Sequence, residues 1–173
     1  MISLGRNILI DALVKNSQRI NCVFLNHCGS PAKLHSDIST IDLLVDKNGY
    51  HDFLSFCRSH DAVKEVLLFP RFKRTKVLVK LKDGSELSLK LIRNMIHNGL
   101  STLPIDEIWQ ECHTNSDGLL VPAEHHHYEY VMMKCQFSGV VFQDKYQKYF
   151  SSMDAANRSN VFRYLRSEEH TSE

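Results

Sequence analysis

The stretch NCVFLNHCGSPAKLHSDISTIDLLVDKN, from Asn21 to Asn48, decides the expected fold. Two short runs of β-branched and apolar residues, Ile20–Asn26 and Thr40–Asp46, flank a segment that holds Gly29 and Ser30. Short apolar runs bounded by Gly, Pro and Ser are typical of buried strands joined by a loop. The stretch therefore predicts two strands with a loop of small residues between them.

Outside this stretch, hydrophobic periodicity predicts an α+β (α/β) chain. Apolar residues at helical spacing indicate helices, and strict alternation indicates half-buried strands. We expect a mixed sheet of about five strands with flanking helices, followed by a helical C-terminal region. The expected helices are Leu4–Lys15, Tyr50–Ser59, Pro104–Cys112, Pro122–Phe137, Asp144–Phe150 and Asp154–Leu165, and the further strands are Ala62–Phe69, Lys76–Lys82 and Glu86–Ile92.

Turn residues set the expected connections between these elements. Asn48-Gly49 predicts a turn before the second helix, and Pro70 predicts the end of a strand. Asp83-Gly84-Ser85 predicts a three-residue hairpin loop, in which Gly84 or Ser85 takes the bulge conformation. That register places Lys82 opposite Glu86.

Length and composition favour one globular domain. The chain has 173 residues, is 43% hydrophobic and 24% charged, and carries a formal charge of +1, which argues against disorder. The longest apolar runs, such as Ile8–Ile10 and Val66–Phe69, are too short to cross a bilayer. Five scattered cysteines without a C-x-x-C pair suggest reduced thiols, so we expect a cytoplasmic protein without a membrane partner.

The order strand, Gly29-Ser30, loop and strand with Asp42 resembles the nucleotidyltransferase superfamily, which has the polymerase-beta-like fold. Nine residues separate Ser30 from Thr40, which fits the spacing of that family. The resemblance implies that Gly29 and Ser30 bind nucleotide phosphates and that Asp42 is a catalytic metal ligand. Two carboxylates at i and i+2 on one strand face can share the Mg²⁺ ions that assist phosphoryl transfer.

The sequence departs from the family pattern at two of the three expected carboxylates. Thr40 stands where the first carboxylate is expected, and Lys90 stands where the third is expected. A fixed ammonium about 4 Å away repels a divalent ion by several kcal/mol. We therefore expect Lys90 to pair with Asp42 and to fill the vacant site. The alternative is that Asp37 or Asp46 replaces a missing ligand.

The resemblance continues downstream through VPAEHHHYEYVMMKCQFSG and DKYQKY, and covers about residues 20–165. It is similar in pattern to nucleotidyltransferase-like domains that precede thymidylate-kinase-like P-loop domains. It implies a sheet domain over residues 1–100 and a helical region over 101–165. Residues 166–173, RSEEHTSE, read like a translated sequencing adapter, so we expect a truncated chain whose fused kinase-like domain follows.

Two further features suggest binding sites. Residues 71–93 contain eight Lys or Arg residues against two acidic ones, a local charge of +6, which suits a phosphate-rich partner or a solvated hairpin face. The run His125-His126-His127 suggests a metal site. Because successive helix positions point about 100° apart, the three imidazoles are not expected to converge on one ion. Glu124 with His127, or His125 with Glu129, would make a weaker pair.

These observations lead to three hypotheses about function. The first is a nucleotide-binding or regulatory module with a degenerate metal site, which needs no cofactor and leaves enzymatic activity undecided. The second is an active Mg²⁺-dependent nucleotidyltransferase that uses Asp42 together with Asp37 or Asp46. The third is a basic module that binds nucleic acid.

Overall fold

A computed structural model gives the fold. It describes residues 4–26, 34–35, 40–94, 96–97, 100–101, 104–138, 144–152 and 159. The predicted α+β class is confirmed, with a mixed five-stranded sheet, flanking helices and a helical C-terminal part.

The central sheet has the strand order β1-β2-β5-β4-β3. Strands β2 and β5 are parallel, and the other neighbours are antiparallel. Two small sheets, which the sequence did not predict, pair β6 with β7 and β8 with β9. The strands are β1 Cys22–Phe24, β2 Ile41–Val45, β3 Val63–Arg71, β4 Arg74–Leu81, β5 Glu86–Ile92, β6 Ile96–His97, β7 Leu100–Ser101, β8 His113–Thr114 and β9 Leu120–Val121.

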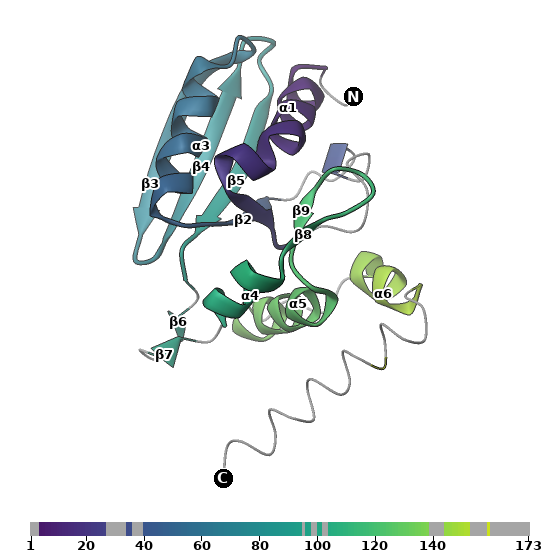
Figure 1. The fold of residues 1–173 in the computed structure, drawn as a ribbon. Coiled ribbons are helices and arrows are strands. Elements are labelled where there is room, and N and C mark those ends of the chain that lie inside the picture. The colour runs from purple at the N-terminus through teal and green to yellow at the C-terminus, as the bar shows by residue number, and fades with distance from the viewer. Residues whose placement is uncertain are drawn as a thin grey trace.

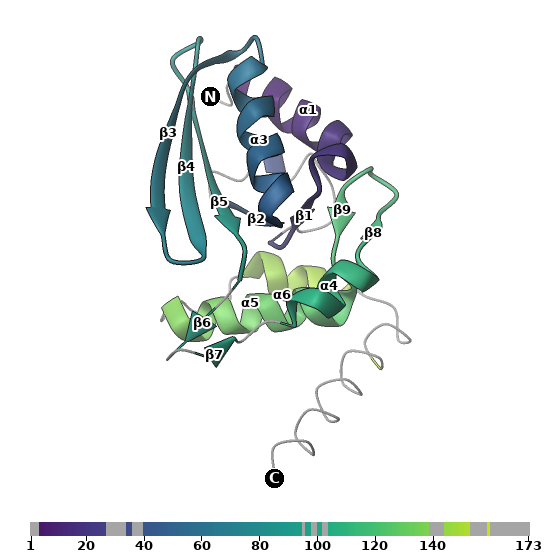
Figure 2. The same ribbon diagram turned by 60° about the vertical axis from the view of Figure 1, so that its left-hand side comes forward.

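Helices cover the two faces of the sheet unequally. Helices α1 (Leu4–Ile20) and α3 (Lys47–Ser59) lie on one face, over a core of alternate residues from all the central strands (Figure 1). Helices α4 (Ile105–Glu111), α5 (Glu124–Ser138) and α6 (Asp144–Ser151) form a second layer, whose core includes side chains of β1, β2 and the end of β5. Figure 2 shows this layer below the sheet, while no described helix lies over the outer face of β3 and β4.

Helix α3 begins three residues before its predicted start, so the expected Asn48-Gly49 turn is wrong. Asp46 caps the helix, and its carboxylate accepts a hydrogen bond of 2.6 Å from the Gly49 backbone N–H. A Cβ atom at Gly49 would lie 2.6 Å from the carbonyl oxygen of Asn21. The glycine is therefore needed for close backbone approach inside the first helical turn.

Pro70 does not end its strand, because β3 continues to Arg71. Strand β3 is at the edge of the sheet, where the missing N–H of a proline is tolerated. Pro70 lies opposite Thr75 in the ladder with β4. The predicted strand end at Pro70 is therefore wrong, because an edge strand can continue through a proline.

The β4–β5 hairpin has a register two residues away from the predicted one. Lys80, and not Lys82, lies opposite Glu86. A shift of two residues keeps every side chain on its predicted face, so the alternation of apolar residues does not distinguish the two registers. The loop is closed by a hydrogen bond of 2.9 Å from the Leu81 N–H to the Ser85 carbonyl, and Gly84 takes the positive φ of 84°.

Helix α1 continues to Ile20, beyond its predicted end at Lys15, and helices α4, α5 and α6 lie within two residues of their expected bounds. Gly118 takes a positive φ of 83° in the turn between β8 and β9. The helix expected over residues 154–165 and the tail at 166–173 lie outside the described residues. A search of the described helices finds none with the length and apolar character of a membrane span.

Candidate functional site

The site is built around Asp42, one of the three carboxylates in the stretch Asn21–Asn48. Its side chain has no exposed surface, although it lies on the sheet face opposite α1 and α3. Asn26 fixes the backbone around it: its Oδ1 accepts from the Asp42 N–H at 2.8 Å, and its Nδ2 donates to the Thr40 carbonyl at 2.8 Å. Asn26, just after β1, therefore fixes the backbone of β2 at Asp42.

Three side chains contact the Asp42 carboxylate. The Tyr130 hydroxyl donates to Oδ2 at 2.7 Å, the Lys134 ammonium lies 2.5 Å from the same oxygen, and the Lys90 ammonium lies 3.7 Å from Oδ1. Lys90 is opposite Asp42 in the parallel β2–β5 ladder. The predicted pairing of Lys90 with Asp42 is thus confirmed, and burial of the carboxylate is compensated by two cations.

Sequence reasoning missed Tyr130 and Lys134. They lie 88 and 92 residues from Asp42 and come from α5, one helical turn apart. The spacing i and i+4 places them on one helix face, which was a usable signal, but it did not show which part of the sheet that face would contact. Burial, and next the Asp42 carboxylate, raise the pKa of Tyr130 well above its usual value.

The described residues do not fit a magnesium centre at Asp42. Thr40, the first departure, places its hydroxyl 3.2 Å from that of Ser88, and so supplies no negative charge. Asp46 caps α3 and accepts a hydrogen bond of 3.0 Å from Asn21. Four residues of extended chain separate it from Asp42 by about 13 Å, too far for a shared ion. Gly29, Ser30 and Asp37 lie outside the described residues.

Next to Asp42, a cleft of about 380 Å³ opens on the same sheet face. The ladders place Asp42 beside Lys90, Lys90 beside Lys76, and Lys76 beside Phe69. The side chains that line the cleft are one aromatic ring and four cations, Phe69, Arg71, Arg74, Lys76 and Lys90.

The cleft brings cations into direct opposition. Lys76 faces Lys90 across β4 and β5, and Arg71 faces Arg74 across the β3–β4 turn. Like charges at directly opposed positions destabilise a sheet. Among the described residues, no carboxylate forms an ion pair with Arg71, Arg74 or Lys76, whereas Lys80, outside the cleft, pairs with Glu65 at 3.0 Å. The cleft therefore has an excess of positive charge that an anion would neutralise.

No protein-family model, curated protein or solved structure matches the chain. The geometry around Asp42 and the resemblance of the Asn21–Asn48 stretch are therefore the features that bear on function.

Proposed function

We propose that the chain binds a phosphate-bearing ligand, of which a nucleotide is the favoured example, in the cleft beside Asp42. In this proposal the protein is a nucleotidyltransferase-like binding or regulatory domain that does not carry out metal-dependent transfer. The cations of the cleft hold the phosphate groups, and the exposed ring of Phe69 supplies a surface on which a base can stack.

One observation carries the proposal: two pairs of like charges face each other around one cleft. Lys90 already has the Asp42 carboxylate as a partner, whereas Arg71, Arg74 and Lys76 form no ion pair among the described residues. Repulsion among these cations costs folding free energy unless a further anion lies between them. Phosphate oxygens accept hydrogen bonds from guanidinium and ammonium groups, and bidentate arginine contacts are particularly strong. The volume of about 380 Å³ also lies in the range of small-molecule sites, about 300–1,000 Å³.

The state of Asp42 supports binding without transfer. Its carboxylate already has two ammonium groups and a phenol as partners, so a divalent ion would have to displace them.

The resemblance to domains that precede kinase-like P-loop domains suggests a regulatory task in a larger cytoplasmic protein. The free state of the described cysteines, Cys22, Cys57, Cys112 and Cys135, suits a reducing compartment.

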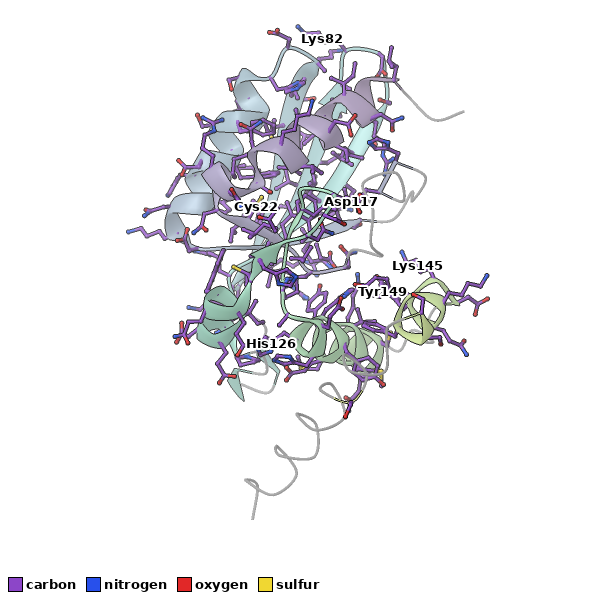
Figure 3. All side chains as sticks on the ribbon, turned by 45° about the vertical axis from the view of Figure 1, so that its right-hand side comes forward. Cys22, Lys82, Asp117, His126, Lys145 and Tyr149 are labelled. Atoms are coloured by element: carbon purple, nitrogen blue, oxygen red, sulfur yellow. The ribbon has the colours of Figure 1, made fainter. Side chains whose placement is uncertain are left out.

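Calorimetric titration of the whole chain with ATP and with pyrophosphate tests the proposal. Lys76→Glu should weaken binding of both ligands by at least tenfold, because it replaces attraction by repulsion. Lys82→Glu is the matched control, since it makes the same charge change on an exposed residue at the far end of the hairpin (Figure 3). Equal effects of the two substitutions, or no binding by the unaltered chain, would contradict the proposal.

A third variant separates the base from the phosphates. Phe69→Ala should weaken ATP binding and leave pyrophosphate binding unchanged, because stacking on an aromatic ring is worth about 1–3 kcal/mol per base. Equal weakening of both ligands would mean that Phe69 shapes the cleft and does not stack.

Two further measurements address the alternative functions. Mg²⁺-dependent transfer of labelled nucleotide that is lost in Asp42→Ala would establish the active enzyme. Salt-sensitive binding of a polynucleotide that Lys80→Glu and Lys82→Glu weaken as much as Lys76→Glu would indicate that the whole hairpin face binds nucleic acid.

A further inference from the structure

A separate group of side chains gathers where α4 ends and α5 begins. Glu111 is the last residue of α4, and His125 and His126 are in the first turn of α5. The Oε2 atom of Glu111 lies 3.1 Å from Nε2 of His125 and 3.4 Å from Nε2 of His126. Figure 3 shows His126 on the part of α5 that faces α4. Glu111 thus lies within reach of both imidazoles.

The distances among these donor atoms suit a tetrahedral metal ion. Zn²⁺ binds imidazole nitrogen and carboxylate oxygen at about 2.0–2.1 Å, so two ligand atoms of one tetrahedron are about 3.3–3.4 Å apart. The two distances from Glu111 agree with this value, and all three donor atoms lie within 4.8 Å of one another. Two His and one Glu leave a fourth position for water.

A second carboxylate, besides that of Glu111, lies near the two imidazoles. His126 is fully buried, and Oε2 of Glu129 lies 3.7 Å from its Nδ1. This distance is too long for a hydrogen bond, so the Glu129 carboxylate contributes negative charge near the site and does not fix the orientation of the His126 ring.

We propose that Glu111, His125 and His126 form a binding site for Zn²⁺ or a similar divalent transition-metal ion. The site is independent of the phosphate cleft, and it joins α4 to α5. The expectation that three adjacent imidazoles do not converge holds for His127, whose Nδ1 lies 3.9 Å from Glu124 and whose ring packs on Tyr149 and Phe150. The third ligand, Glu111, comes from another helix, α4, and the spacing of residues within α5 does not reveal it.

Titration of the metal-free chain with Zn²⁺ in a calorimeter, together with the visible spectrum after titration with Co²⁺, tests the proposal. We expect one ion per chain and the intense spectrum of four-coordinate Co²⁺. Glu111→Gln and His125→Gln should each weaken Zn²⁺ binding by at least tenfold. His113→Gln, which removes an exposed imidazole from β8, is the matched control and should bind as the unaltered chain does.

The variants distinguish unfolding of the chain from removal of a metal-binding side chain. Glu111 is 48% exposed, so its amide variant should keep the circular dichroism spectrum and thermal midpoint of the metal-free chain. Unchanged Zn²⁺ affinity in Glu111→Gln and His125→Gln would overturn the proposal, as would equal weakening by His113→Gln or the absence of a one-to-one complex.

Discussion

Asp42, Lys90 and Lys76 lie side by side across the sheet, but the charges of Asp42 and Lys76 have opposite surroundings. At the β2 end, Asp42 is fully buried and contacts Lys90, Lys134 and Tyr130. At the β4 end, Lys76 is exposed and faces another lysine. A buried charge needs partners within the protein, whereas water screens an exposed one. The comparison shows that the charge of Asp42 is neutralised within the protein, whereas that of Lys76 has no ion pair among the described residues.

The largest expected effect comes from removal of Asp42. Asp42→Ala should lower the free energy of unfolding by about 3 kcal/mol, the lower end of the range for one partner of a buried ion pair, because Lys90 and Lys134 are 32% and 30% exposed and can turn to water. Urea unfolding measures this change. Asp52→Ala, on the exposed side of α3, is the control and should change stability by less than about 0.5 kcal/mol. Equal losses in both variants would break the comparison.

Tyr130→Phe should have a smaller effect, about 2 kcal/mol, because it removes one hydrogen bond to a charged group and keeps the packed ring. Retention of full stability would show that the phenol does not support the Asp42 carboxylate.

The same residue predicts a change of stability at high pH. Because the pKa of Tyr130 is raised in the folded state, the unfolded chain releases this proton first as the pH rises. The contribution of Tyr130 should be complete below about pH 10, the ordinary tyrosine pKa, and should decline above it. Unfolding curves from pH 8 to about 11 should therefore converge for the unaltered chain and Tyr130→Phe.

The smallest change in stability is expected at Lys76, and it should have the opposite sign to that of Asp42→Ala. Lys76→Gln should raise stability by a few tenths of a kcal/mol, because it removes repulsion with Lys90. Lys80→Gln should lower stability by up to about 0.5 kcal/mol, since it removes the exposed pair with Glu65. Thermal unfolding at low and high salt sharpens this contrast, because salt should reduce both changes. Loss of stability in Lys76→Gln would contradict the proposed repulsion.

Local patterns were sufficient to predict much of the fold. Apolar residues alternate with polar ones in β4 and β5, and they recur at helical spacing in α1, α3 and α5. Each of these elements packs one regular face on a core, so its type could be read from the spacing of its apolar residues. The register of the β4–β5 hairpin was not predictable, since a shift of two residues preserves both faces. The Asp42–Lys90 contact followed from the resemblance to the nucleotidyltransferase pattern, in which Lys90 takes the place of the third carboxylate. The contacts of Asp42 with α5, and of Glu111 with the histidines, depend on tertiary packing that local patterns do not encode.

Helix α5 contributes side chains to two clusters, the one around Asp42 and the one around Glu111. His126, Tyr130 and Lys134 follow one another at intervals of four residues, so their side chains differ in direction by about 40° from each to the next and rise along the axis by about 6 Å. A rotation or sliding of α5 that alters the distance between His126 and Glu111 must also move the two groups that neutralise Asp42. One helix thus carries a side chain that contacts Glu111 of α4 and two side chains that contact Asp42 of β2, so its position fixes the geometry of both clusters at once.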